Sequence, residues 1–383
     1  NPKHLLAVLG KNMIRGSYCF DCIAAGATLF VMVACGCERN SHPGTNADGI
    51  NVYTDKEFTS MYMPNRGGVT SADGTISFVL DDGSSIFMTG DAFVGDVYAN
   101  RRSTSDKMIN NAFVHISSDA KYLGAYYGGT KESPSSLCYP LEAETSAVKF
   151  WYWPGHGFQE GNRIYAFMTK FYQGGEGMWG FVFAGTDLVI FDEDYKVLSR
   201  KELFDRNCPV HWGHSVMKDG EYYYVYGTGG NGGMYVYRTQ MAGGILAAPE
   251  FYSDGNWASD SVPTVCSGIT VPVSEQFSVF RHGDNYILLT MKRESQSGEI
   301  YSFVARSPEG PWENEKMLYR TKEQDCDKNL FTYNAMAHPQ FINNRNELLI
   351  CYNVNSFDVP QIFSQVSAYR PVFLRVPMSM IEE

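Results

Sequence analysis

Short apolar segments alternate with polar turns along the chain from Gly67 onward, and none of them shows the 3.6-residue period of an amphipathic helix. Five of these segments share one plan: an apolar strand meets a tight polar turn, and a second strand rich in aromatic and β-branched residues follows. Each unit therefore predicts a β-hairpin. The five turns lie at residues 81–83, 160–162, 218–220, 282–284 and 343–345.

The five hairpins recur at a nearly regular interval. Successive starts lie 83, 58, 61 and 63 residues apart if the first strands begin at Asp73, His156, His214, Glu275 and His338. The long interval contains a polar insert. A repeat of about 60 residues led by a hairpin is typical of a β-propeller with four-stranded blades. We therefore predict an all-β fold, a five-bladed β-propeller; a β-sandwich with coincidental spacing is the alternative.

The segment before the repeats looks like an export signal. Arg15 precedes an apolar run at residues 23–34, which leads into Cys35-Gly36-Cys37. A basic start, an apolar core of about a dozen residues and a small-residue cleavage site describe such a signal. With Cys37 at the cut, residues 1–37 resemble a bacterial lipoprotein signal, in which the lipidated cysteine becomes the first mature residue. Cys35 is a competing site.

This interpretation divides the chain into a signal, a polar tether at residues 38–60 and one propeller domain at residues 61–383, because no repeat buries its own face alone. It predicts export and a lipid anchor at the bacterial outer membrane, facing the periplasm or the cell surface. The alternative assigns Cys19, Cys22, Cys35 and Cys37 as four zinc ligands. The apolar run between the two cysteine pairs lacks the turn residues of a zinc knuckle.

Propeller geometry predicts where the hairpins place their polar ends. The starts of the first strands and the ends of the second strands collect on one face, around the central channel where propeller ligands bind. We therefore expect a ring of candidate residues on that face. The ring comprises Asp73, His156, His214, Glu275 and His338, with Asp91, Lys170, Lys292 and Asn353 just outside it.

Each candidate also has a structural interpretation. Asp73 precedes a glycine and fits a turn, Asp91 fits a strand-end cap, and a single histidine is more often a structural group than a catalyst. Three of the five equivalent positions carry histidine, however, and Glu275 stands between apolar neighbours where its charge needs a partner. A ring of histidines also suits a bound metal ion or water.

Aromatic residues gather next to these polar positions. Trp153 lies just before His156, and Trp212 lies just before His214. Aromatic faces beside carboxylates and imidazoles suit sugar recognition, because the apolar face of a sugar ring stacks while its hydroxyls form hydrogen bonds. Core packing explains any one of these aromatics equally well.

Composition removes other classes of function. The chain carries 31 Lys and Arg against 42 Asp and Glu, a net charge of −11, which argues against a nucleic-acid binder that depends on phosphate contacts. Five cysteines are scattered singly, so buried thiols are expected rather than a disulfide framework. They are Cys138, Cys208, Cys266, Cys326 and Cys351.

The sequence resembles two known families. The segment Ala305-Arg-Ser-Pro-Glu-Gly-Pro-Trp312 is similar to the blade-edge turn of the five-bladed propeller glycoside hydrolases. That superfamily contains the family 43 arabinosidases and xylosidases and the family 32 invertase-like enzymes. A closer resemblance, over residues 67–378, is to an uncharacterised propeller family common among secreted and lipoprotein-type proteins of gut Bacteroides-like bacteria. Its motifs lie at residues 71–77, 89–93, 334–339, 352–355 and 369–374.

The resemblance to the glycoside hydrolases implies roles for particular residues. In the characterised enzymes an Asp at the first-blade strand start acts as base, and Asp73 occupies that place. Their acid is a Glu at a later strand start, but the third blade has His214, and the second-blade Asp that tunes the acid is replaced by His156. The acid is therefore expected to be Glu275, Asp91 or His214. No cofactor is implied with certainty; a channel-bound cation such as calcium is compatible with the fold.

Two hypotheses of different class follow. In the first, the protein is a surface-anchored, monomeric glycosidase or related enzyme that acts on an oligo- or polysaccharide, with Asp73, Glu275, His214 and Asp91 as catalytic candidates. Asp91 and His156 would orient the substrate and Trp153 would stack on a sugar. The full set of substrate-binding candidates is His156, Trp153, Lys170, Trp212, His338, Lys292 and Asn353. In the second hypothesis, the chain is a non-catalytic glycan-binding lipoprotein. A buried carboxylate pair with one raised pKa favours the enzyme.

Overall fold

The computed structural model describes residues 44–45 and 51–382, apart from residues 178, 231, 261–263, 267, 270–271 and 294–296. The chain divides into two compact units, Asn1–Asn40 and Ser41–Glu383, and the description concerns the second. The expected signal with Cys37, and the four alternative zinc ligands, lie outside the described residues. Within the described part, no helix is both long and apolar enough to cross a membrane.

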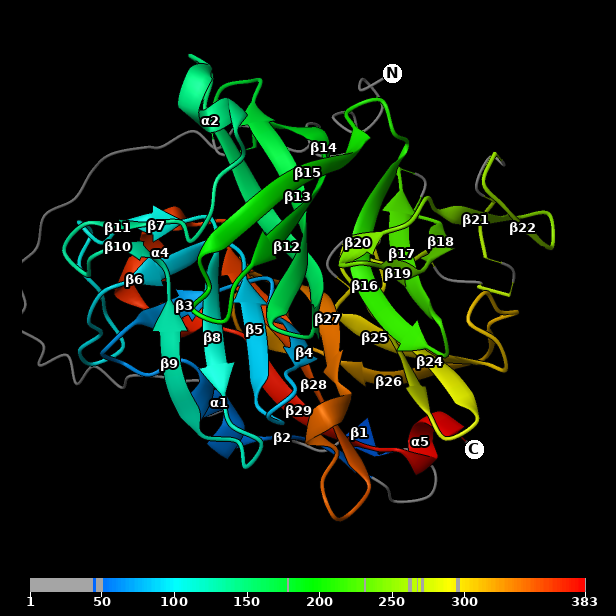
Figure 1. Ribbon diagram of the computed structural model, residues 1–383. Helices are drawn as coiled ribbons and strands as arrows, with labels where there is room; N and C mark the ends of the chain where they lie inside the picture. Colours follow the sequence, from blue (N-terminus) through cyan, green and yellow to red (C-terminus); the bar gives the residue numbers. More distant parts are fainter. Residues whose placement is uncertain are drawn as a thin grey trace, which may run out of the picture. The chain divides into compact units, whose positions relative to one another are not determined.

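Five antiparallel sheets of four or five strands dominate the described structure (Figure 1). Four of them use consecutive parts of the chain. In sheet order, the first two comprise β4 (Ile76–Val79), β5 (Ser85–Thr89), β8 (Ala112–Ile116) and β9 (Tyr122–Tyr126), and then β12 (Phe150–Glu160), β13 (Arg163–Gln173), β14 (Phe181–Phe191) and β15 (Val197–Asp205). The next two comprise β16 (Val210–Asp219), β17 (Tyr222–Gly229), β18 (Met234–Thr239), β21 (Glu250–Ser253) and β22 (Asn256–Ala258), and then β23 (Ser278–His282), β24 (Asn285–Met291), β25 (Glu299–Ala305) and β26 (Glu313–Arg320).

The fifth sheet joins the two ends of the unit. Its C-terminal strands are β27 (Leu330–His338), β28 (Glu347–Ser356) and β29 (Val372–Pro377), and it is completed by β2 (Asn51–Thr54) and β1 (Gly44–Thr45) from the N-terminal side. Tyr53 pairs with Arg375 across β2 and β29. The folded unit therefore begins earlier than expected, because β2 lies within residues 38–60, which the polarity pattern assigns to a tether.

Helix α1 (Lys56–Tyr62) also lies largely within the expected tether and is packed into the fold. The Asp55 carboxylate accepts a hydrogen bond from the Phe58 amide at 2.8 Å, which caps the helix, and it receives the Arg375 guanidinium at 2.8 Å. Phe58 and Tyr62 are buried, and the Phe58 ring lies 4.7 Å from that of Phe373 on β29. The helix thus covers the junction between the two chain ends.

Each of the five sheets opens with one of the predicted hairpins, so the prediction of a predominantly β chain is confirmed. The first strands contact one another in chain order, β4 with β12, β12 with β16, β16 with β23 and β23 with β27. In addition, β27 contacts β4. The first strands of the first and last sheets are therefore neighbours, although they are about 250 residues apart in sequence.

Three first strands are interrupted by a bulge next to the site. The pairing register shifts between Pro154 and Gly157 in β12, between Trp212 and Ser215 in β16, and between Tyr333 and Met336 in β27. These strands start earlier than the sequence analysis expected: His156 and His214 are residues inside the bulges rather than strand starts, and His338 ends β27. The run of apolar and aromatic residues before each histidine extends the strand in the N-terminal direction.

The remaining elements are short and connect or flank the sheets. A small sheet contains β3 (Val69–Ala72), β6 (Ala92–Val94) and β7 (Met108–Ile109). Two further pairs are β10 (Gly128–Gly129) with β11 (Pro134–Ser135) and β19 (Met241–Ala242) with β20 (Ile245–Leu246). The other helices are α2 (Glu142–Thr145), α3 (Glu323–Cys326), α4 (Val359–Ser364), α5 (Ser379–Glu382) and the 3₁₀ segments η2 (Pro339–Phe341) and η3 (Val366–Tyr369).

The core lies between neighbouring sheets. Second strands such as β5 and β24 are almost continuously buried rather than alternating, because neighbouring sheets cover both of their faces. The expectation of buried thiols is confirmed for Cys138, Cys266 and Cys351, whereas Cys208 is partly buried and Cys326 is exposed. None of these five cysteines forms a disulfide.

Replacement of Phe58 by Ala tests whether α1 belongs to the folded unit. Because Phe58 is 3% exposed against Phe373, we expect the free energy of unfolding to fall by about 3–5 kcal/mol, as for other large-to-small core changes. Denaturant unfolding measures the change. Val79→Ala, at a side chain that is 50% exposed, serves as a control and should alter stability little. Equal stability of both variants would contradict the packing of α1.

Candidate active site

Two clusters of ionisable side chains lie near the N-terminal ends of the first strands. The aspartate pair consists of Asp73, in the loop between β3 and β4, and Asp91, in the loop between β5 and β6. The histidine–glutamate cluster consists of His211 and His214 on β16 and Glu275 in the loop before β23. Four of these five residues were candidates from the sequence.

The aspartate pair is held by hydrogen bonds from two sheets and from the loop between β7 and β8. Asp73 Oδ2 accepts from the Tyr333 hydroxyl at 2.7 Å. Asp91 Oδ1 accepts from the Trp153 indole Nε1 and from the Asn110 amide Nδ2, each at 2.7 Å. The backbone ties the two residues together, since the Asp73 amide donates to the Asp91 carbonyl at 3.3 Å. The two carboxyl groups therefore share one small, partly buried region.

Burial and the negative charge of Asp91 together raise the pKa of Asp73 to about 7, although the Tyr333 hydrogen bond opposes the shift. Burial also raises the pKa of Asp91, against the hydrogen bonds from Trp153 and Asn110 that stabilise its anion. The pair therefore holds a proton up to near-neutral pH. A carboxyl group with a pKa close to the working pH is suited to general acid or base catalysis.

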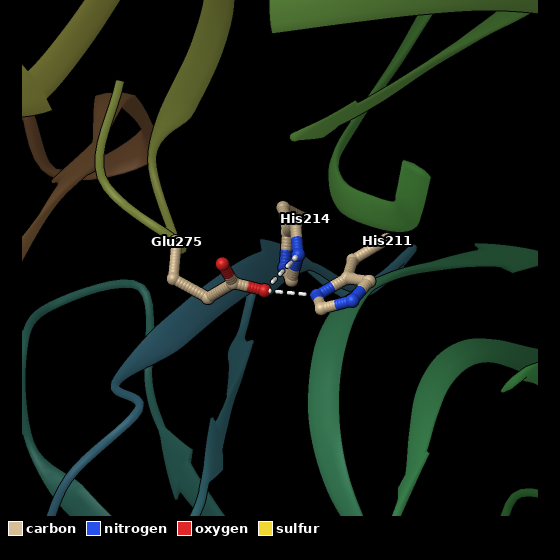
Figure 2. Close-up of side chains that lie close together, drawn as sticks. All are labelled: His211, His214 and Glu275. Carbon is tan, nitrogen blue, oxygen red and sulfur yellow. Dashed lines mark hydrogen bonds and ion pairs between the residues drawn. The ribbon is translucent and has the colours of Figure 1, made fainter. Parts of the chain in front are cut away.

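The histidine–glutamate cluster has the opposite electrostatics. Figure 2 shows Glu275 pointing at both imidazoles, with Oε1 2.5 Å from His211 Nδ1 and 3.4 Å from His214 Nε2. Its second oxygen, Oε2, lies 3.3 Å from the Arg293 guanidinium. Burial alone would raise the pKa of Glu275, but its contacts with His211 and His214 lower that pKa well below its usual range. Glu275 therefore remains ionised, which is contrary to the acid role expected for it.

A bulge brings the two histidines of this cluster to one side. Residues three apart on a regular strand point to opposite faces. His214 lies inside the bulge of β16 between Trp212 and Ser215, where this regular alternation does not apply, and its ring faces Glu275 as the His211 ring does. Gly213 lies between them at φ +90°, and a Cβ at this position would collide with the Phe167 side chain. The backbone therefore permits only glycine here.

Gln276 connects the two clusters. Its side-chain amide donates to the Pro154 carbonyl at 3.2 Å and accepts from the Asn334 amide at 3.1 Å. Pro154 is adjacent to Trp153, which binds Asp91, and Asn334 is adjacent to Tyr333, which binds Asp73. The second, fourth and fifth sheets therefore meet at one side chain, and both clusters belong to the same region of the fold.

Comparison with known proteins identifies the family. A family described as "Domain of unknown function (DUF5005)" matches residues 55–378. The chain belongs to the DUF5005 family. This confirms the resemblance to a family of unknown function, and the match starts near α1 rather than at Gly67. No protein with a curated description matches the sequence.

One solved structure shares the fold of this DUF5005 domain, and two others are less similar to it. A protein from Bacteroides ovatus named "putative hydrolase" is 18% identical, with a TM-score of 0.72, over 88% of this chain and 92% of the other. A GH43_1 enzyme from Xanthomonas citri in complex with xylotriose is 12% identical, with a TM-score of 0.46, over 83% and 90% of the two chains. CoXyl43, a GH43 β-xylosidase/α-arabinofuranosidase from a compost microbial metagenome, is 11% identical, with a TM-score of 0.43, over 83% and 94%. At these identities the similarity concerns the fold alone.

Of the expected histidines, His338 lies in the interior of the DUF5005 domain and His156 is partly buried. His338 is fully buried, with Nδ1 2.6 Å from Ser77 Oγ and Nε2 3.2 Å from Cys351 Sγ. Burial lowers the pKa of His338 to about 3 and that of His156 to about 4, so both are neutral at physiological pH. The strands start further upstream than predicted, so neither histidine stands at a strand start, and the full burial of His338 removes it from contact with a ligand.

Three other expected binding residues have structural partners. Lys170 is 3% exposed and lies 2.8 Å from both Glu142 of α2 and Glu202 of β15, so its charge is already neutralised by neighbouring carboxylates. Trp212 is 1% exposed and belongs to the core between sheets. Asn353 is fully buried and accepts a hydrogen bond from Thr75 at 3.1 Å. In this structure none of these side chains is placed to meet a ligand.

Lys292 and Trp153 have contrasting positions. Lys292 follows β24 and lies 3.5 Å from Glu299, on the same sheet, rather than next to Glu275. Trp153 is brought to Asp91, as described above, and packs between the rings of Phe171 at 4.7 Å and Phe181 at 5.0 Å. Of the expected binding residues, Trp153 is therefore the one placed next to the aspartate pair.

Several residues of the site were missed in the sequence analysis. His211 was overlooked although the His-x-x-His spacing with His214 is visible in the sequence. Tyr333, Asn110 and Gln276 carry no local motif, because they meet the site only through contacts between sheets. The His-x-x-His spacing could have been found; the other three required the tertiary structure.

The histidine–glutamate cluster is also the one group of three or more His, Cys, Asp or Glu residues in the described part of the chain that is arranged to hold a metal ion. Its three ligand atoms lie within 4.8 Å of one another. Calcium prefers oxygen ligands, so two imidazoles do not fit the calcium ion considered from the fold.

Replacement of Asp73 by Asn should change how stability depends on pH. The pKa of Asp73 is raised on folding from 3.8 to about 7, so the unfolded chain loses this proton at lower pH than the folded chain. The stability of the natural protein therefore falls as the pH rises from about 4 to about 7. The asparagine side chain has no such proton, and its carbonyl oxygen can still accept from Tyr333. We expect the denaturation midpoint of Asp73→Asn to exceed that of the natural protein at pH 8.

The difference should shrink toward pH 4, where the folded and unfolded forms of the natural protein both hold the proton. Thermal or denaturant unfolding across this range measures it. A stabilisation by Asp73→Asn that is larger at pH 4 than at pH 8 would show that the pKa of Asp73 is not raised.

Proposed function

We propose that this DUF5005 protein hydrolyses an oligo- or polysaccharide and that Asp73 and Asp91 are its acid/base pair. The observation that supports this most directly is the aspartate pair itself, with the pKa of Asp73 raised to about 7 by burial and by Asp91. A non-catalytic glycan-binding protein has no need of two repelling carboxyl groups, because their burial costs stability. The pair therefore favours an enzyme over a binding protein.

Aromatic side chains next to the pair support a sugar as substrate. Trp179 is 65% exposed and lies 6.5 Å from the Phe181 ring, which contacts Trp153 beside Asp91. Next to Asp73, the Tyr333 ring packs at 5.5 Å on Phe331, and Phe331 stacks on the exposed ring of Phe357. Apolar faces that lead from solvent toward a carboxyl pair suit a chain of several sugar rings. We therefore propose an extended glycan rather than a single sugar.

The proposed chemistry follows from the different surroundings of the two carboxyl groups. The hydrogen bonds from Trp153 and Asn110 stabilise the anion of Asp91 against the rise in pKa that burial causes, while Asp73 keeps its proton to near-neutral pH. In the protonated form Asp73 can donate to the glycosidic oxygen, and as a carboxylate it can accept a proton from water. The expected role of Asp73 as a base is thus widened to both directions of proton transfer.

We propose, in addition, that the five sheets are the blades of a closed five-bladed propeller and that the domain is monomeric. The contact of β27 with β4 and the joining of the chain ends in the fifth sheet support closure. The shared fold with the "putative hydrolase" of Bacteroides ovatus supports the class of enzyme. A crystal structure with a blade count other than five would refute this architecture, and sedimentation analysis measures the oligomeric state.

Replacement of Asp73 by Asn tests the proposed activity. The natural protein is incubated with a panel of plant, algal and host glycans, and released reducing ends are measured. We expect hydrolysis of at least one glycan and a loss of about 100-fold or more in Asp73→Asn, in keeping with removal of a general acid/base. Binding of the same glycan should persist, because the asparagine amide keeps the shape of the site.

The matched control is Asp194→Asn, at a surface carboxylate that is 77% exposed, which should retain full activity. If the natural protein binds a glycan and releases no sugar from any member of the panel, the protein is a glycan-binding protein instead. Equal loss of activity in both variants would refute the assignment of Asp73.

We also propose that the protein is exported and anchored to the cell envelope through lipid on Cys37. The support is the order of charges, apolar run and cysteine at residues 15–37. In a bacterial host expressing the full chain, incorporation of labelled fatty acid measures lipidation. We expect Cys37→Ser to abolish the label and Cys35→Ser to retain it. The reverse result would assign the anchor to Cys35, and the absence of label from the natural protein would refute the signal.

A further inference from the structure

We propose that His211, His214 and Glu275 bind one divalent transition-metal ion of the zinc class. This site is separate from the aspartate pair, and the inference does not depend on glycan hydrolysis. It combines two imidazoles and one carboxylate from two neighbouring sheets, which come together only in the folded chain. Two nitrogen ligands and one oxygen ligand are a common donor set for Zn²⁺.

The distances in the cluster suit a small cation. Zinc binds nitrogen and oxygen at about 2.0–2.2 Å, so neighbouring ligand atoms in a tetrahedral site lie about 3.3 Å apart. The separation of His214 Nε2 and Glu275 Oε1 is 3.4 Å. His211 Nδ1 and Oε1 are closer, at 2.5 Å, and form a direct hydrogen bond. A metal ion would replace that hydrogen bond, with a carboxylate movement of less than about 1 Å.

His214 provides a second, independent observation. The side chain is 3% exposed, and neither ring nitrogen has a hydrogen-bond partner within the described structure. Nε2 faces Glu275 at 3.4 Å but in a geometry that makes no hydrogen bond. A buried imidazole with two unsatisfied nitrogens is costly. A metal ion bound to Nε2 would remove part of this cost, and it explains why a polar ring occupies this position.

The backbone also fixes the ligands in place. The bulge in β16 and the left-handed conformation at Gly213 turn His211 and His214 toward the same side. The His211 ring stacks on Phe183 at 4.0 Å, which restricts its rotation. A site whose ligands are held before the metal arrives binds more tightly, because less conformational entropy is lost.

One coordination position would remain open to solvent. The side chains of His211 and Glu275 are 29% and 37% exposed, so the site is reached from one side. Three protein ligands and one open position are typical of catalytic rather than structural zinc. Arg293 lies 3.3 Å from Glu275 Oε2 and is itself held by Thr228 at 3.1 Å. Its positive charge opposes a cation, and the ionised Glu275 between them offsets that repulsion.

Metal titration of the full-length protein tests the proposal. The protein is stripped with a chelator, and Zn²⁺ binding is followed by calorimetry. We expect one equivalent to bind at this site and the affinity to fall at least tenfold in His211→Gln and in Glu275→Gln, at the two partly exposed ligands. Circular dichroism establishes that each variant is folded. His214 is buried, so its replacement is not needed for the test.

The matched control is His282→Gln. His282 Nδ1 lies 2.8 Å from Glu382, so the variant breaks a similar histidine–glutamate pair that lacks a second imidazole. Zn²⁺ affinity should be unchanged. An equal loss in His282→Gln, or equal affinity in all variants, would refute the site.

Co²⁺ substitution separates this site from the cysteines of the chain. Bound to His211, His214 and Glu275, Co²⁺ should give visible absorption typical of a four- or five-coordinate ion, without the near-ultraviolet charge-transfer band of thiolate ligands. Loss of the visible band in His211→Gln supports the proposal. A thiolate band that survives in His211→Gln, with no other signal, would assign the metal to cysteines and refute it. Glycan hydrolysis is scored separately, through Asp73.

Discussion

The pairing of β2 with β29 is the contact on which the rest of the structure depends. Each sheet covers the face of the next, so the first and last sheets would each leave an apolar face open unless the chain ends meet. Tyr53 and Arg375 pair across these strands, and Asp55 holds the Arg375 guanidinium at 2.8 Å. The free-energy cost of closing the loop of about 320 residues between the paired strands grows only slowly with loop length.

The candidate active site lies across the same junction. The Tyr333 hydroxyl of the fifth sheet donates to the carboxylate of Asp73, which lies just before the first sheet. The Tyr369 hydroxyl donates to the Asp91 carbonyl at 3.0 Å. Deeper in the fold, Asn353 and His338 of the fifth sheet contact Thr75 and Ser77 of the first at 3.1 and 2.6 Å. The aspartate pair therefore depends on contacts between the first strands at the start of the domain and the C-terminal part of the chain.

Similar burial produces opposite charge states in the two clusters. Asp73 has another carboxylate as its nearest charged neighbour, so burial and repulsion both raise its pKa. Glu275 faces two imidazoles and the Arg293 guanidinium, and these contacts outweigh burial. A residue type at a given strand position therefore does not determine its role. The sequence analysis expected Asp73 as the base and Glu275 as one candidate for the acid, whereas the raised pKa of Asp73 and the lowered pKa of Glu275 make Asp73 the group that keeps a proton.

The hairpins could be predicted from the sequence because their signals are local: turn residues, alternation and a spacing near 60 residues. Asp73, Asp91 and Trp153 were found for the same reason, since they stand at hairpin ends. The depth of each first strand could not be predicted. Aromatic residues before His156 and His214 extend β12 and β16 in the N-terminal direction. The two histidines therefore lie inside bulges, and Trp212 becomes a core residue. The partners of Lys170 could not be predicted either, because the carboxylates that neutralise it come from α2 and β15.

The bulges explain why residues just upstream of the expected ring form the site. They occur in β12, β16 and β27, and each contains a residue suited to unusual backbone: Gly155, Gly213 at φ +90° and Asn334 at φ 51°. A Cβ on Gly155 would collide with the Gly213 carbonyl oxygen, so the bulges of neighbouring strands are in close contact. The bulges in β12 and β27 each insert one residue and reverse the alternation of side chains beyond them, whereas the bulge in β16 inserts two residues and preserves it. A residue pattern read with an uninterrupted period of two therefore assigns the wrong face to side chains beyond the bulges in β12 and β27, and it cannot place His214, which lies inside the bulge of β16.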